Sequence, residues 1–195
     1  NNLAIGKDAL AANTTGTYNI AIGPYAYDAA TASDHNLAIG YDAMGGPVTA
    51  GLSGALYNVG IGNYSMDALT SGDHNTAVGY KSGTALTTGS ANTAFGGLAL
   101  EDNTTGSYNE AIGYVALYNN TTGESNTALG TEALKNNTTG SRNISIGRAA
   151  LDGPDTENDN LAIGYEALGA AIAGGEFNVA IGNYSMDALT SGDNN

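Results

Sequence analysis

Apolar and polar residues recur along this chain with a fixed short period. The stretch "NTALGTEALKNNTTGSRN" begins at Asn126 and returns to Asn after 17 residues, and its neighbours on both sides have the same form. The chain contains eleven units of the form N-x-A-I-G-x-x-A-L-x-x-N-T-T-G-x-x, whose places we number 1 to 17 from the first Asn. A short period repeated along a whole chain is typical of a solenoid, in which each repeat forms one coil.

Place 1 is Asn in every unit. Most gaps between these residues are 17, and the exceptions are 22 after Asn36 and 18 after Asn160. In a stack of coils each place lies over the same place of the next coil, so an Asn column can pass amide hydrogen bonds along the stack. We therefore predict a structural Asn ladder, with a ligand-binding row as the alternative. Its members are Asn2, Asn19, Asn36, Asn58, Asn75, Asn92, Asn109, Asn126, Asn143, Asn160 and Asn178.

Place 4 is always apolar and mostly β-branched, which is typical of a strand residue that faces a core. We predict that this place forms the buried core. Its residues are Ile5, Ile22, Ile39, Ile61, Val78, Phe95, Ile112, Leu129, Ile146, Ile163 and Ile181. Place 3 is small, place 5 is always Gly, and place 9 is usually Leu or Met.

The turn residues in each unit favour strands over helices. Gly occurs two or three times per unit, each costing a helix about 1 kcal/mol relative to Ala, and N-T-T-G is a typical turn sequence. We predict two short strands per unit, joined by tight turns. The fold class is all-β: a narrow parallel β-solenoid, or β-roll, of eleven coils that forms a single segment over residues 1–195.

A longer repeat overlies the coil repeat. The stretches "NVGIGNYSMDALTSGDH" (58–74) and "NVAIGNYSMDALTSGDN" (178–194) differ at two places, and the units before them also correspond, at an offset of 124 residues. Two over-length coils, 36–57 and 160–177, fall at matching positions of this seven-coil super-repeat. Because the first and last units read as internal coils, we expect either a longer parent array or copies stacked end to end.

Composition excludes several functions. The formal net charge is −14 and only five residues are Lys or Arg, so no basic patch for nucleic acid can form. No apolar run approaches the ~20 residues that span a bilayer, and without Cys there is no disulfide or thiolate metal site. No catalytic constellation and no phosphate-binding loop are present, so we expect no enzyme, no catalytic or metal residues and no cofactor.

Other polar residues read as surface groups. His35 and His74 stand alone in the last turn of their units and are expected to be solvated. Acids recur at places 10 and 16 but skip coils, which favours a solvated anionic face, with a stray surface calcium site as the alternative. Tyr residues, many of them at place 6, are expected to face outward. They suit stacking between coils or chains, or contact with a glycan or protein.

Small residues suggest one route to association. Ala128, Gly130 and Ala133, at places 3, 5 and 8, would let a neighbouring chain approach closely, although they would also fit tight corners within a coil. The burial available to one coil falls short of the entropy of ordering it, so we expect self-association, as a trimer or as an end-to-end or lateral fibre.

The units "NIAIGPYAY" and "NLAIGYEAL" resemble the head repeats of trimeric autotransporter adhesins, and the N-T-A-x-G-x-x-A-L arrays of phage tail-fibre-like proteins. The resemblance covers the whole chain. It implies a left-handed parallel β-roll, association of three chains, a place outside the cell or on a cell or virion surface, and binding to a surface component.

Three functions follow as hypotheses. The first is a structural protein that forms an extracellular fibre or filament. The second is an adhesin or tail-fibre shaft that binds a surface glycan or protein. The third and most remote is an ice-binding solenoid, suggested by the recurring Thr104, Thr121 and Thr138, although these lie in a turn rather than on a flat strand face.

Overall fold

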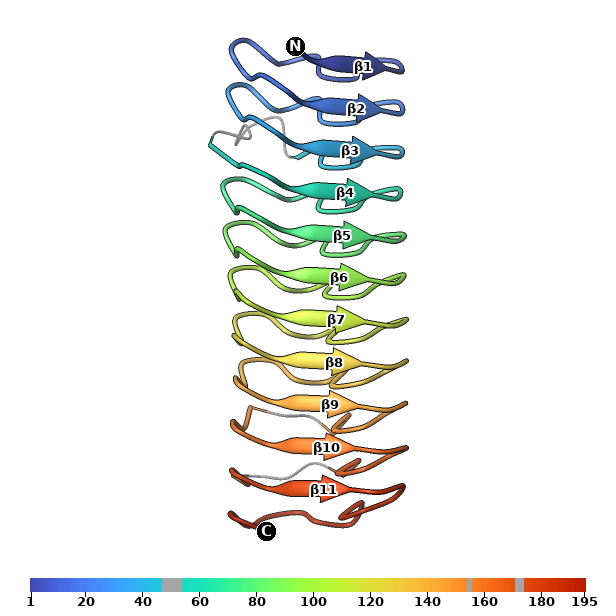
Figure 1. The fold of residues 1–195 in the computed structure, drawn as a ribbon, viewed down its shortest axis with the longest axis vertical. Helices are drawn as coiled ribbons and strands as arrows, with labels where there is room; N and C mark the ends of the chain where they lie inside the picture. Colours follow the sequence, from blue (N-terminus) through green and yellow to red (C-terminus); the bar gives the residue numbers. More distant parts are fainter. Residues whose placement is uncertain (47–53, 154–155, 171–173) are drawn as a thin grey trace.

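The chain folds as a rod of stacked coils. The computed structural model describes residues 1–46, 54–153, 156–170 and 174–195. In these ranges it contains no helix and a single parallel sheet of eleven strands, which follow one another in sequence order (Figure 1). The strands are β1 (Leu3–Ile5), β2 (Ile20–Ile22), β3 (Leu37–Ile39), β4 (Val59–Ile61), β5 (Thr76–Val78), β6 (Thr93–Phe95), β7 (Glu110–Ile112), β8 (Thr127–Leu129), β9 (Ile144–Ile146), β10 (Leu161–Ile163) and β11 (Val179–Ile181).

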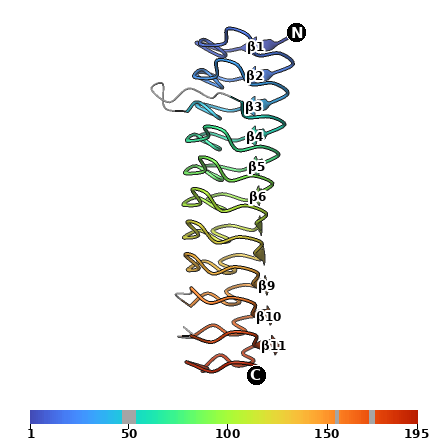
Figure 2. The ribbon, with the colours of Figure 1, turned by 90° about the vertical axis from the view of Figure 1, so that its left-hand side faces the viewer.

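Every strand pairs in the register that the repeat predicts. Place 3 lies beside place 3 of the next coil, as in Ala111 beside Ala128. The two over-length coils keep this register, because Leu37 pairs with Val59 and Leu161 pairs with Val179. The termini therefore lie at opposite ends of the rod (Figures 1 and 2). The predicted all-β parallel solenoid is confirmed.

The prediction of a second strand in each unit is wrong. The wall opposite the sheet is made of two consecutive turns, closed within coil seven by Ala116 N–H to Gly113 O at 3.4 Å and Asn120 N–H to Leu117 O at 3.3 Å. Places 7 and 9 adopt positive φ, as in Leu117 at 52°, so this wall cannot extend into a strand. It still bonds to the next coil, for example through Leu117 N–H to Ala133 O at 3.0 Å.

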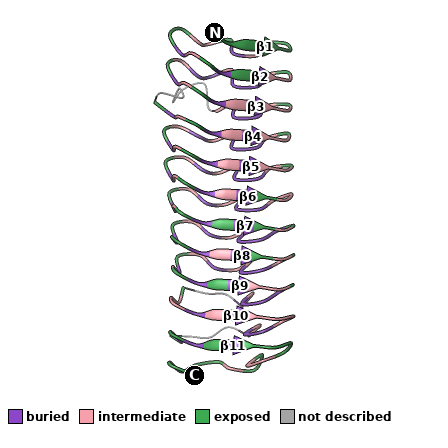
Figure 3. Ribbon diagram, in the orientation of Figure 1, coloured by how far each residue is buried: buried purple, intermediate pink, exposed green. Residues whose placement is uncertain are grey.

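The sheet faces the opposite way from the prediction. None of the predicted core residues at place 4 is buried, and places 2 and 4 of every strand are exposed or half-buried, whereas place 3 is buried in β2–β11 (Figure 3). Because successive side chains of a strand alternate between its faces, places 2 and 4 lie together on the outer face. Ile5, Phe95, Ile112, Leu129 and Ile181 are 54%, 55%, 41%, 44% and 65% exposed. The others, which are partly exposed, are Ile22, Ile39, Ile61, Val78, Ile146 and Ile163.

The interior is built from smaller groups, because the two walls of a coil lie very close together. Ala at places 3 and 8 and Leu or Met at place 9 form the continuous core. Where place 3 is Gly60, an added Cβ would lie 2.8 Å from Met44 Cγ. Where place 3 is Ser145, its hydroxyl donates across the coil to Ala150 O at 2.7 Å. An isoleucine at place 3 would not fit, so the branched side chains lie outside.

The small residues do not offer a lateral contact surface. Ala128 and Ala133 are 1% and 0% exposed, so the prediction that they contact a neighbouring chain is wrong. Gly130 has φ +136°, and a Cβ there would lie 2.6 Å from Gly147 O in the next coil. Place 5 is therefore Gly because neighbouring coils approach each other closely at this corner.

The described residues include no helix long and apolar enough to cross a lipid bilayer.

Candidate functional site

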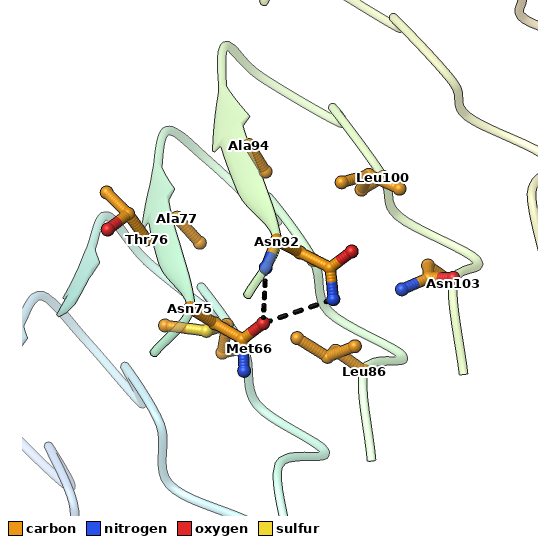
Figure 4. A pocket seen from close by; sticks show the side chains of 10 residues that line it. Met66, Asn75, Thr76, Ala77, Leu86, Asn92, Ala94, Leu100 and Asn103 are labelled. Carbon is orange, nitrogen blue, oxygen red and sulfur yellow. Dashed lines mark hydrogen bonds between the residues drawn. The ribbon is translucent and has the colours of Figure 1, made fainter. Parts of the chain in front are cut away.

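The Asn column at place 1 forms a continuous hydrogen-bonded ladder inside the rod. The backbone N–H of Asn92 donates to Asn75 Oδ1 at 2.9 Å, and Asn92 Nδ2 donates to the same oxygen at 3.1 Å (Figure 4). Asn92 Nδ2 also donates to Gly106 O, at place 15 of its own coil, at 2.9 Å. The backbone N–H to Oδ1 bond recurs from Asn19 to Asn195 at 2.8–3.1 Å.

The side chains of the Asn column are buried, which gives the column a structural role rather than a ligand-binding one. From Asn19 to Asn178 these side chains are 0–3% exposed, so no ligand can reach them. Each one accepts a buried N–H of the next coil and donates to a buried carbonyl of its own coil. Where place 12 is Asn, that carbonyl accepts a second bond, as Gly106 O does from Asn103 Nδ2 at 3.0 Å. Of the two readings of place 1, the geometry supports the ladder.

Sequence reasoning missed a second Asn column, at place 12. Asn120 Nδ2 donates to Asn103 Oδ1 at 2.9 Å, and Asn137 Nδ2 donates to Asn120 Oδ1 at 2.8 Å. These residues are 0–1% exposed. The signal was the first letter of N-T-T-G, which sequence analysis assigned to turn chemistry alone.

The largest candidate interaction surface is the outer side of the sheet. We call the outward side chains at places 2 and 4 of β1–β11 the sheet face. Glu110 is the one charged residue among these eleven strands, and most of the other outward residues are Ile, Leu or Val. Place 4 is apolar in every strand, whereas place 2 is polar in the four strands β5–β8, at Thr76, Thr93, Glu110 and Thr127. A contiguous apolar surface of this kind is often functional.

Stacked aromatic rings border one end of the strands. At place 17, just before the Asn, Tyr18, His35, Tyr57 and His74 follow one another with ring centroids 5.0, 5.0 and 5.1 Å apart. Both histidines are exposed, as predicted, but each lies against tyrosine rings. The ring faces are covered by neighbouring coils, so this column stabilises the stack rather than presenting ring faces to a ligand.

A second aromatic column borders the other end. Tyr25, Tyr41, Tyr64 and Tyr80, at places 6 and 7, make edge-to-face contacts with centroids 5.7, 5.4 and 6.3 Å apart. The expectation of outward tyrosines has one exception: Tyr27, at place 9, is fully buried and accepts a hydrogen bond from Asn36 Nδ2 at 2.5 Å.

The pKa values of the acidic side chains are shifted in both directions by their surroundings. Burial raises the pKa of Asp28, Asp42 and Asp152, and raises that of Asp67 to about 6. Hydrogen bonds from Thr17 lower the pKa of Asp34.

The structure brings no metal-binding set together. Among the described residues, no group of three or more His, Asp or Glu side chains could hold a metal ion.

The hydroxyl groups of the recurring threonines form hydrogen bonds between neighbouring coils. Thr104 Oγ1 donates to Thr121 O at 3.0 Å, and Thr121 Oγ1 donates to Thr138 O at 2.9 Å. These hydroxyls therefore tie successive turns together.

No protein-family model, no curated protein and no solved structure matches this chain.

Proposed function

We propose that this protein is a structural, non-catalytic rod that builds an extracellular fibre or surface filament, and that its copies associate laterally through the sheet face. The observation that carries the proposal is the apolar, almost uncharged surface that runs over all eleven strands. The resemblance of the repeats to adhesin heads and tail-fibre arrays agrees with it.

The size of the sheet face supports association. Eleven strands about 4.8 Å apart, each about 10 Å long, give a surface of roughly 480 Å². The largest apolar patch on a typical monomer is about 300–600 Å² and is often functional. A standard stable interface buries ~800 Å² per partner, so the sheet face alone supplies somewhat more than half of one.

Charge directs a second copy to the sheet face. With a formal net charge of −14, two copies repel each other over most of their surfaces. The sheet face carries only Glu110, so apolar burial meets the least repulsion there. The identical spacing of coils in two copies also lets their apolar rows align along the whole rod.

Changing the sheet face alone tests this proposal. Leu129 is 44% exposed and Ile146 is half-buried in the single chain, so the double variant Leu129→Lys/Ile146→Lys should keep its coils. Light scattering and sedimentation should show an assembly for the unchanged chain and a monomer for this variant. The control, Thr122→Lys/Thr139→Lys, adds the same charge at exposed turn residues and should still assemble. A monomeric unchanged chain at every concentration would refute the proposal.

A second candidate is a shaft that binds a surface glycan or protein. It is favoured by tyrosines such as Tyr108 and Tyr114, which are 66% and 57% exposed. Binding of the rod to immobilised glycans or cell surfaces, lost in a Tyr108→Ser/Tyr114→Ser variant that still assembles, would support this function over a purely structural one.

A further inference from the structure

The polar residues of the sheet face form one block near its middle. Place 2 is apolar in β1–β4 and in β9–β11, and it is polar only in the four consecutive strands between them. These polar residues are Thr76 in β5, Thr93 in β6, Glu110 in β7 and Thr127 in β8. Among the described residues, their hydroxyl and carboxylate groups form no hydrogen bond or ion pair within the chain. The block is centred between β6 and β7, and its polar groups are free to bind a partner.

The regular stacking of the strands limits how two such faces can pack. The strands lie over one another and point in the same direction, so places 2 and 4 form two rows along the rod (Figure 1). Two identical faces can pack about a two-fold axis in two ways. An axis along the rod keeps the rods parallel and sets the place 2 row of one copy against the place 4 row of the other. An axis along the strands makes the rods antiparallel and sets place 2 against place 2.

Parallel rods would leave the polar block without partners. Each coil would then lie at the level of the same coil in the other copy, with place 2 against place 4. Glu110 would face Ile112 of the other copy, and Thr93 would face Phe95. Burying a carboxylate and three hydroxyls against apolar side chains is costly, because they lose water and gain no hydrogen bond.

Antiparallel rods match the two faces along their length. With the axis between β6 and β7, β6 of one copy faces β7 of the other, and β5 faces β8. Thr93 then faces Glu110, so each carboxylate meets a hydroxyl donor, and Thr76 faces Thr127. The strands β2–β4 face β9–β11, where places 2 and 4 are apolar on both sides.

A shift of the axis by half a coil breaks this match. With the axis on β6, Thr127 faces the apolar Val59 of the other copy. With the axis on β7, Glu110 faces its own equivalent, and two like charges meet in an apolar interface. One register therefore pairs every polar residue with a polar residue and every apolar residue with an apolar one.

We propose that the sheet face pairs with a second copy of this chain as an antiparallel two-fold dimer whose axis lies between β6 and β7. This inference rests on the proposed lateral association and adds its direction and its register. The strands β2–β11 take part, and at about 4.8 Å per coil they bury roughly 430 Å² per copy. This area is at the small end of specific interfaces, so the pairing should depend on protein concentration.

Two lysine variants form a matched test. In the chain itself Thr93 and Thr127 are the two strand neighbours of Glu110, so a lysine at either position lies beside the same carboxylate. Only the lysine of Thr93→Lys also faces Glu110 of the other copy. Sedimentation equilibrium should therefore give Thr127→Lys a dimer dissociation constant about tenfold higher than that of Thr93→Lys, since two such ion pairs form per dimer. In parallel rods both lysines would face apolar side chains and would weaken the dimer equally.

Spin labels measure the direction without changing the sheet face. The chain has no Cys, and Thr15 and Thr105 are exposed at place 14 of the first and sixth coils. In the antiparallel dimer the labels of Thr105→Cys lie one coil apart along the rod, and those of Thr15→Cys lie eleven coils or about 53 Å apart. Labels on Thr88→Cys and Thr139→Cys, in the fifth and eighth coils, should be equally far apart, because the axis lies midway between those coils.

The outcomes separate this inference from the proposed function. A chain that is monomeric at every concentration would overturn both. An assembly in which Thr15→Cys and Thr105→Cys give the same distance would consist of parallel rods, in a dimer or a trimer, and would overturn the antiparallel pairing while the proposed function stands. Unequal distances for Thr88→Cys and Thr139→Cys, or equal weakening by the two lysines, would also overturn the inference.

Discussion

An asparagine at place 1 meets two needs with one side chain. Its oxygen accepts the N–H of the next coil, as Asn126 Oδ1 accepts from Asn143 at 3.0 Å, and its amide donates to its own coil, as Asn126 Nδ2 does to Gly140 O at 2.8 Å. Aspartate lacks the donor and alanine lacks both groups. This pairing explains at the level of single atoms why the chain returns to Asn in every coil.

We therefore expect Asn126→Ala to destabilise the rod strongly. It would leave the buried Asn143 N–H without its acceptor, at about 1–3 kcal/mol. It would also remove one of two hydrogen bonds to the Gly140 carbonyl, which keeps the bond from Asn137 Nδ2 at 3.0 Å, at a further ~1 kcal/mol. Urea unfolding followed by circular dichroism should show a loss of ~2–4 kcal/mol. Asn119→Ala is the control, because half-buried Asn119 donates one bond, to Asn136 Oδ1 at 2.9 Å, near solvent. Comparable losses for the two variants would contradict the buried-ladder account.

The one strand of each coil shows what sequence could and could not predict. Spacing alone gives the parallel stack, its register and the Asn column. The facing of the strand was predicted wrongly because branched apolar side chains usually lie inside, whereas this interior is too narrow for them. The correct signal was parity: Thr76, Thr93 and Glu110 at place 2 share a strand face with place 4, while the Asn and Ala share the other.

The second wall and the surface sites were less accessible to prediction. Residues such as Leu117 at positive φ give no sequence signal, because Leu is not a left-handed turn residue; only the surrounding coils hold it there. The aromatic columns could have been read from recurring Tyr and His at places 6, 7 and 17. Whether the rings stack or meet edge to face is not specified by spacing.

Adjacent residues of β7 test the corrected facing. Ala111 is fully buried and Ile112 is 41% exposed. Ala111→Asp should place an unpaired charge in the core and cost at least ~3 kcal/mol. Ile112→Asp should cost about 1 kcal/mol or less, the range of strand propensity.

Thermal unfolding at low protein concentration is the suitable measurement, since it separates folding from association. If Ile112→Asp lowered the midpoint as much as Ala111→Asp, the side chains at place 4 would have to be part of the core after all.

At the scale of the whole rod, charge and burial oppose each other. Stability is the sum of contacts between neighbouring coils, while the acidic surface repels itself and other copies. The sequence pI is about 4.1, so this repulsion declines as the pH falls from neutrality toward 5. Folding, and the lateral association that we propose through the sheet face, should therefore both strengthen on mild acidification.

Asp67 gives this pH dependence a sign and a window. Its pKa is raised to about 6 in the folded chain from an ordinary value of 3.8, mainly by burial and then by Asp42 and Asp28. Between these two pH values the folded state thus binds more protons than the unfolded state. Protonation of Asp67 therefore stabilises the fold, fully below pH 3.8, and this contribution is lost as the pH rises through 6. Asp34, whose pKa is lowered, acts in the opposite direction, but only below about pH 4.

We expect the free energy of unfolding to decrease between pH 4.5 and 7. Asp67→Asn should make that decrease about 1–2 kcal/mol smaller, once solvent screening is allowed for. Urea titrations at half-unit pH steps would measure both curves. Asp187→Asn is the matched control, because Asp187 corresponds to Asp67 in the super-repeat but is exposed, and its curve should parallel that of the unchanged chain. A pH dependence that Asp67→Asn leaves intact would mean that repulsion spread over the whole acidic surface, rather than Asp67 with Asp42 and Asp28, sets the response to pH.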